Sequence, residues 1–122
     1  MLKKLLYFAS VAEFGTGLAL LIDPALVVAL LVGGDLSGAG VVAARGFGIA
    51  LVALGLACWP SEPHPQADSP AFRAMLTYNA AIALFLVYLF AVAHLEGMLL
   101  WPAVALHGIV ALLLVFAWRN ER

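Results

Sequence analysis

The chain alternates long apolar runs with short polar breaks. Four of the runs are long enough to cross a membrane as helices, because a hydrocarbon core of ~30 Å requires about 20 helical residues. Their expected bounds are 5–22, 40–59, 72–94 and 99–118. A fifth run, residues 25–33, is about half as long and indicates a short interfacial or re-entrant helix. The pattern predicts an all-α, integral membrane four-helix bundle with a short helix between its first two spans.

Turn-forming residues mark the breaks between these runs. Asp23-Pro24 ends the first span, since proline restricts the residue before it. The longest polar segment, residues 60–71, is rich in proline and predicts an extended loop. A tight turn at residues 95–98 joins the last two spans. The spans together are expected to form a single four-span membrane domain over residues 1–122.

Composition narrows the function classes. Hydrophobic residues make up 66% of the chain and charged residues 11%. Such a composition is typical of a protein embedded in a membrane, so we expect the lipid bilayer to be a partner. Six basic residues and a net charge of −1 leave no basic patch for nucleic acid. The lone Cys58 has no partner for a disulfide or a CxxC site, and no catalytic, metal-binding or cofactor-binding motif appears. We therefore expect a protein that is not an enzyme and holds no metal or cofactor.

The distribution of positive charge predicts the orientation. Lysine and arginine are retained in cytoplasmic segments, whereas acidic residues have little influence. Five of the six basic residues lie in the termini or next to the proline-rich loop: Lys3, Lys4, Arg73, Arg119 and Arg122. We expect both termini in the cytoplasm and the spans in an inner membrane. The alternative, a cleaved signal peptide over residues 1–22, is disfavoured by Glu13 in the middle of its apolar core.

Each predicted span carries one polar side chain well inside its apolar run: Glu13, Arg45, Asn79 and His107. A charge at the centre of a membrane helix costs about 2.5 to 3.5 kcal/mol on insertion scales, so such groups usually face a bundle interior or a watery cavity. These four residues are the candidates for handling a ligand or a proton.

Depth along the helices divides these candidates into two expected tiers. Glu13 and Asn79 form an inner tier, where an isolated carboxyl group could hold or relay a proton, or could serve only as an interhelical hydrogen-bond partner. Arg45 and His107 form an outer tier, where a guanidinium and an imidazole could bind an anion, a carboxylate or a quinone-like carbonyl. A direct ion pair between Glu13 and Arg45 is the less favoured arrangement.

Three more polar residues are expected at the outer rim of the bundle, namely Asp35, His94 and Glu96. Because Arg45 is within reach of the outer interface, an ion pair with Asp35 or Glu96 is an alternative to a ligand-binding role.

Small residues lie on two faces of the second predicted span. Gly48 and Gly55 share one face, and the nearly opposite face carries Gly46, Ala50, Ala53 and Ala57. Helices in lipid associate through close contact at small residues, so this span is expected to be central. A homodimer contact would explain the second face, and an Ala/Gly-rich composition is the alternative.

One resemblance arises at Ala12-Glu13-Phe14-Gly15-Thr16. The chain length, the four spans and the glutamate in the first helix look like the small multidrug resistance transporters, in which that glutamate binds protons and cationic substrates in antiparallel dimers. The match covers only the first span. Arg45, the absence of a tryptophan from the third span and the one-sided positive charge depart from that family, so the chain is not assigned to it.

Two function classes remain open. The favoured one is a non-catalytic accessory, assembly or helix-docking membrane protein, whose polar residues serve packing and whose small-residue faces contact a second copy or a larger membrane protein. The alternative is a small transporter or ligand-binding membrane protein that uses Glu13 and an Arg45/His107 pocket. The first is favoured because a chain of 122 residues without a catalytic motif offers few residues that could carry out transport or ligand binding.

Overall fold

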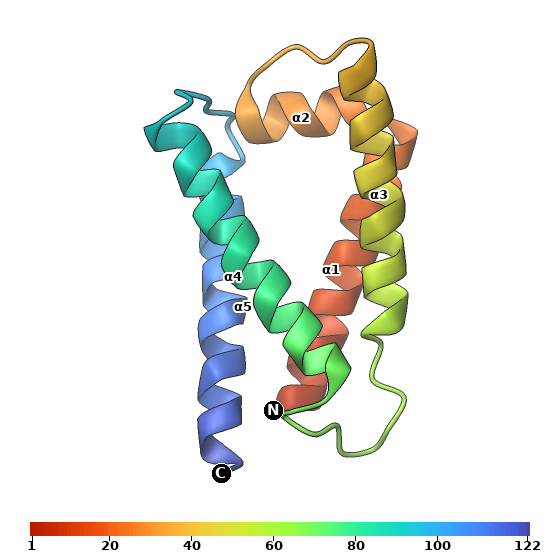
Figure 1. The fold of residues 1–122 in the computed structure, drawn as a ribbon, viewed down its shortest axis with the longest axis vertical. Helices are drawn as coiled ribbons and strands as arrows, with labels where there is room; N and C mark the ends of the chain where they lie inside the picture. The colour runs from red at the N-terminus through yellow and green to blue at the C-terminus, as the bar shows by residue number, and fades with distance from the viewer.

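The computed structural model describes residues 1–122 and contains five helices and no strand (Figure 1). The helices are α1 (Leu2–Ile22), α2 (Pro24–Val32), α3 (Ala39–Ala57), α4 (Pro70–Ala91) and α5 (Leu100–Asn120). All except the short α2 are long and apolar enough to span a membrane. The predicted all-α, four-span fold with a short helix between its first two spans is confirmed.

The four long helices form two pairs. α1 packs along α3, and α4 packs along α5. The short α2 lies across one end of both pairs and contacts α1, α3 and α5, whereas both chain termini lie at the opposite end (Figure 1). These two ends are termed the α2 end and the terminal end. α4 runs obliquely, so that its first turns approach the start of α1 near the terminal end (Figure 1).

Local capping explains where α2 and α4 begin. The Asp23 side chain accepts a hydrogen bond from the Leu26 backbone N–H at 3.2 Å, and Pro24 takes the first helical position. Ser69 and Pro70 repeat the arrangement at the start of α4, where Ser69 Oγ accepts from the Phe72 N–H at 3.2 Å. The break predicted at Asp23-Pro24 is therefore a direct passage from one helix into the next.

Glycines allow α1 and α3 to approach closely. A Cβ atom added at Gly17 would lie 2.6 Å from the Gly48 carbonyl oxygen, and one added at Gly55 would lie 2.7 Å from the Ser10 carbonyl oxygen. The close approach predicted for the Gly48 and Gly55 face is confirmed. The expected central position of this span is wrong, because it is α1 that contacts every other helix.

The buried core fills the terminal end of the bundle. Its side chains come from α1, α4, α5 and the segment between α3 and α4: Leu2, Leu6, Ala9, Cys58, Ala67, Phe72, Met75, Val110, Leu114 and Ala117. Cys58 is a buried free cysteine that packs in this core as a small hydrophobic residue.

Backbone hydrogen bonds hold the α2 end together. The Gly97 N–H donates to the Leu31 carbonyl at 3.1 Å, and the Leu99 N–H donates to the Leu30 carbonyl at 2.8 Å. These carbonyls belong to the last turn of α2, and without these two bonds they would lack hydrogen-bond donors. The segment between α4 and α5, residues 92–99, is longer than the predicted turn, because α4 ends at Ala91 and His94 lies beyond it with a φ of 54°.

Candidate functional site

Three of the four spans contribute a polar side chain to one central cluster. Nδ1 of His107, on α5, lies 2.8 Å from Oδ1 of Asn79 on α4. The same nitrogen lies 3.7 Å from Oε1 of Glu13 on α1. Glu13 and Asn79 are almost fully buried, with 2% and 1% of their surface exposed. The expected proximity of Glu13 and Asn79 is therefore found, with His107 added to it.

The amide of Asn79 is held in one orientation. Its Nδ2 donates a hydrogen bond to the Met75 carbonyl oxygen at 2.9 Å, one turn earlier in α4. The amide oxygen therefore faces His107 and acts as the acceptor. Because an acceptor oxygen faces Nδ1, this imidazole nitrogen carries the proton.

Tyr78 completes the cluster, although it was not among the candidate residues. Its ring meets His107 edge to face, with ring centroids 5.8 Å apart and an interplanar angle of 83°. Its hydroxyl lies next to the Glu13 carboxyl group and interacts with it. Glu13, Tyr78, Asn79 and His107 are termed the central polar cluster.

An apolar cavity of about 330 Å³ lies between the polar cluster and α2. Tyr78, His107 and Thr16 are its lining residues with polar side-chain atoms, whereas Glu13 and Asn79 lie behind them. The rest of the lining is apolar and comes from all five helices: Leu20, Val27, Val28, Leu31, Val32, Ala43, Ala44, Phe47, Ile82, Phe85, Leu86, Leu89 and Ala103. One end of the cavity is therefore polar and its other walls are apolar.

The cavity and the buried core occupy opposite parts of the bundle. Four residues of α2 line the cavity at its end of the molecule. On the other side of the polar cluster, the core contains fully buried leucine, methionine and phenylalanine side chains. No core residue lines the cavity, so the cavity does not extend to the terminal end.

The two predicted tiers are wrong, because His107 joins Glu13 and Asn79 in one layer. At 1.5 Å per residue, Glu13 lies about 17 Å along α1 from the terminal end, and His107 lies about 20 Å along α5 from the same end. The two side chains span the small difference in level. Glu13 and Asn79 on the one hand and His107 on the other were expected at different depths, but their side chains meet.

Arg45 is not part of this layer, and the predicted Arg45/His107 pocket does not form. Arg45 is exposed and does not line the cavity, although Ala44 and Phe47 on the same helix do. Since successive helical residues are about 100° apart, Arg45 points away from the face that carries Phe47. Its direction, rather than its depth, separates Arg45 from His107.

The predicted rim ion pair is also absent. Asp35, His94 and Glu96 are exposed at the α2 end, and neither carboxyl group lies within 4.0 Å of a basic group. The sole contact of this kind in the chain is that between His107 and Glu13.

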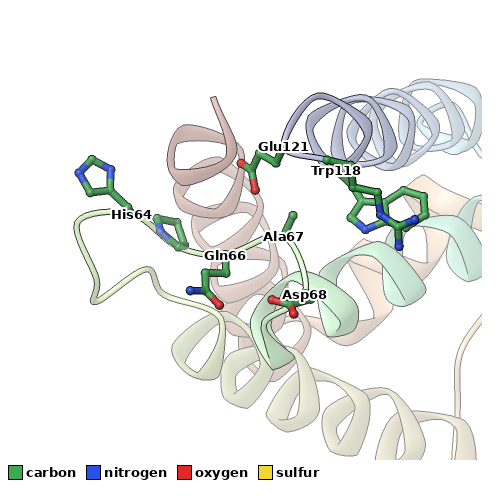
Figure 2. Close-up of a pocket in the computed structure, with 8 residues that line it drawn as sticks. His64, Gln66, Ala67, Asp68, Trp118 and Glu121 are labelled. Atoms are coloured by element: carbon green, nitrogen blue, oxygen red, sulfur yellow. The ribbon is translucent and has the colours of Figure 1, made fainter.

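A polar hollow at the terminal end lies outside the membrane-spanning part. It is formed by the proline-rich loop and the end of α5, and Figure 2 shows the side chains around it. The Arg122 guanidinium lies 4.0 Å from the centre of the Trp118 ring. His64 lies apart from Trp118 and Glu121 (Figure 2), and no group of three side chains there could hold a metal ion. The hollow lacks the converging buried groups that characterise a binding site.

No family model, no curated protein and no solved structure matches this chain.

Proposed function

We propose that this protein is a non-catalytic membrane protein that binds a lipophilic small molecule inside the bilayer. The observation that carries the proposal is the apolar cavity that ends at His107 and Tyr78. Ligand sites combine mostly apolar walls with a few convergent polar groups, and their volumes run from about 300 to 1,000 Å³. A cavity of about 330 Å³ accommodates a small molecule, or the polar end of a longer one.

The polar cluster supports a binding role beyond packing alone. A packing role is fulfilled once polar side chains satisfy one another between helices. Asn79 meets this condition behind the cavity wall, with Glu13 beside it, but His107 also lines the cavity and keeps 14% of its side chain exposed. The cluster therefore presents the rings of His107 and Tyr78 to the cavity, and Asn79 holds the His107 ring in place from behind.

Binding is favoured over transport because of the core at the terminal end. A transported molecule must leave on the side opposite its entry. Leu6, Met75 and Leu114 have no exposed surface and lie between the polar cluster and the terminal end. Packed cores resist local opening because they have few voids. Arg45, the one intramembrane cation, is also outside the cavity, so anion binding has no support there.

Photolabelling tests this proposal. The purified protein in lipid nanodiscs is exposed to a long-chain alcohol that carries a diazirine on its tail. We expect labelling at Phe47, Ile82 or Phe85 in the cavity wall, above the background at Phe116, which is exposed on α5. Equal labelling of the cavity and Phe116 would overturn the proposal.

A matched pair of variants sharpens the experiment. Ala103 lines the cavity one turn before His107, whereas Ala105 on the same helix is exposed. Ala103→Phe fills the cavity and should reduce the labelling of its wall to background. Ala105→Phe adds the same ring outside the cavity and should leave the labelling unchanged.

A second candidate function, helix docking, is favoured by the outer face of α3. Gly46, Ala50, Ala53 and Ala57 are all exposed, and the exposed Arg45 is adjacent to them. A guanidinium that faces lipid alone is costly, and small residues permit close helix contact. We propose a second copy of the chain as the partner on this face.

Disulfide cross-linking in membranes tests the docking face. In a Cys58→Ala background, Ala53→Cys should form a covalent dimer, because paired cysteine Cα atoms must approach within about 7 Å. Ala81→Cys, exposed on α4, is the control and should stay monomeric. Equal cross-linking of the two variants would indicate random collision rather than docking.

We further propose an inner-membrane location with the terminal end in the cytoplasm. Both termini lie at one end of the structure, as four spans require (Figure 1). Five of the six basic residues belong to the termini or to the start of α4, which supports this orientation.

A further inference from the structure

We propose that the ligand of the apolar cavity presents a hydroxyl group, as a hydrogen-bond donor, to Nε2 of His107. This inference rests on the binding function proposed above and names the class of ligand. The class comprises molecules with one protic head and an apolar tail, such as long-chain alcohols and alkyl phenols.

Hydrogen bonding gives the two imidazole nitrogens of His107 different roles. Asn79 Nδ2 is committed to the Met75 carbonyl, so Asn79 Oδ1 accepts the proton of His107 Nδ1. In the neutral ring one nitrogen donates and the other accepts. Nε2 is therefore the acceptor, and it has no hydrogen-bond partner within the chain.

The other polar side chains at the cavity are those of Thr16 and Tyr78. Thr16 Oγ1 donates its proton to the Ala12 carbonyl oxygen at 2.8 Å. The Tyr78 hydroxyl interacts with the Glu13 carboxyl group behind the wall. The Thr16 donor is thus engaged, the Tyr78 hydroxyl has the Glu13 carboxyl group beside it, and the acceptor without a partner is Nε2. A hydroxyl head finds an acceptor at Nε2, whereas a carbonyl head would have to compete with the Glu13 carboxyl group for the Tyr78 hydroxyl.

The apolar tail of the ligand would lie along the apolar walls of the cavity. The α2 end and both helix pairs provide apolar walls, and α3 and α4 share no packed interface beside the cavity. Phe47 on α3 and Phe85 on α4 line the cavity and are 43% and 51% exposed. A tail longer than the cavity therefore continues between these two rings into the bilayer.

A head-group series tests the inference. Dodecanol, dodecyl methyl ether and methyl undecyl ketone are titrated into the full chain in nanodiscs, with concentrations expressed as a fraction of lipid. Binding is followed by competition against the photolabelling of the cavity wall, a readout that requires no histidine and so serves every variant, and in the wild-type protein also through the ring-nitrogen resonances of isotope-labelled histidine. Because one hydrogen bond contributes about 0.5 to 1.5 kcal/mol net, dodecanol should bind about two- to twelvefold more tightly than the ether or the ketone.

Two variants assign the effect to one nitrogen. His107→Phe retains a ring but removes Nε2, so dodecanol and its ether should bind equally to it. His64→Phe makes the same change in the exposed loop and should leave the preference for dodecanol intact. In the wild-type protein, dodecanol should shift the Nε2 resonance of His107 and leave that of His64 in place.

The outcomes separate the head-group inference from the binding function. Equal affinity for all three molecules, tighter binding of the ketone, or a preference that survives His107→Phe would overturn the hydroxyl inference while the cavity still binds lipophiles. If none of the three molecules binds to the wild-type protein, the proposed function falls as well. A preference for dodecanol that is lost in His107→Phe supports both.

Discussion

At the scale of the residue, the central polar cluster is a chain of hydrogen-bonding groups that crosses three helices. It runs from the Met75 carbonyl through the Asn79 amide to His107, with the Glu13 carboxyl group alongside. Polar groups in the hydrocarbon region must find partners within the protein, because no water is present to supply them. The cluster thereby makes three polar side chains compatible with a membrane interior and fixes the ring of His107.

The link between Asn79 and His107 can be measured with a double-mutant cycle. Asn79→Leu and His107→Phe each remove one side of the hydrogen bond and should each lower the free energy of unfolding. Interhelical hydrogen bonds in membranes contribute about 0.6 kcal/mol on average and at most about 1.7, so we expect a coupling energy in this range. Reversible unfolding in mixed micelles provides the measurement. Asn79→Leu combined with His64→Phe should show no coupling, and a zero value for both cycles would contradict the assigned bond.

Ser10 provides a second test at this scale. Its side chain is 1% exposed, and its hydroxyl has no hydrogen-bond partner. A buried hydroxyl without a partner costs about 1 to 3 kcal/mol, so Ser10→Ala should raise the free energy of unfolding by roughly 1 kcal/mol. The same unfolding assay checks the effect, with the exposed Ser37→Ala as a control that should change nothing. A loss of stability in Ser10→Ala would show that the hydroxyl has a partner after all.

The sequence identified the members of the cluster better than their pairing. Glu13, Asn79 and His107 were recognisable because each interrupts an apolar run. Their joint layer was not, because a difference of a few ångströms in level is smaller than the reach of a side chain. Tyr78 was not named as a candidate, because tyrosine is also common at membrane interfaces, although its position next to Asn79 places it at the same level.

At the scale of the element, the contact between α1 and α3 depends on glycine. Gly17 on α1 faces Gly48 and Val52 on α3, where backbone atoms leave no space for a side chain. Helices in lipid gain stability mainly through such close packing. The pair therefore forms a rigid wall for the cavity, to which α1 adds Leu20 and α3 adds Phe47.

Substitution of single glycines in α1 tests this packing. A Cβ atom at Gly17 would lie 2.8 Å from the Val52 backbone nitrogen, so Gly17→Ala must displace one helix. Overpacking of this kind costs about 1 to 3 kcal/mol. Gly15 has nothing within 4 Å, so Gly15→Ala should be neutral or stabilise by up to about 1 kcal/mol. Thermal unfolding in detergent compares the two, and similar losses for both would argue against close packing at Gly17.

The elements themselves were largely predictable. The lengths of the apolar runs gave all four spans and the short α2, and the glycine spacing indicated the packed face of α3. The separation of the two helix pairs at the α2 end, where α2 lies across them (Figure 1), was not predictable, because it depends on how α2 and residues 92–99 meet in three dimensions. For this reason the cavity could not be located from sequence.

At the scale of the whole molecule, the bundle is asymmetric along its length. The terminal end is filled by the buried core, whereas the α2 end contains the cavity. In a membrane protein with one filled end and one hollow end, only one leaflet of the bilayer lies beside the cavity. The orientation of the protein therefore decides which leaflet lies beside the cavity.

The proposed orientation leads to a labelling experiment. In a Cys58→Ala background, Ser61→Cys places a thiol in the exposed loop at the terminal end, and Ser37→Cys places one in the exposed connector before α3. A membrane-impermeant thiol reagent should label Ser61→Cys only in inside-out vesicles and Ser37→Cys only in right-side-out vesicles. The reverse pattern would place the termini outside, and labelling of both variants in both preparations would indicate mixed orientation.

The hydrogen bonds between α2 and residues 97–99 have a consequence for biogenesis. A helix of nine residues is marginal by itself, and the Leu30 and Leu31 carbonyls of α2 find their donors in Leu99 and Gly97, more than sixty residues later in the chain. During synthesis, α1 and α3 can pair as soon as both have emerged, but the last turn of α2 must wait for the turn before α5. The end of the molecule that borders the cavity is therefore the last part to be completed, so a nascent chain that stalls before Gly97 would leave it open.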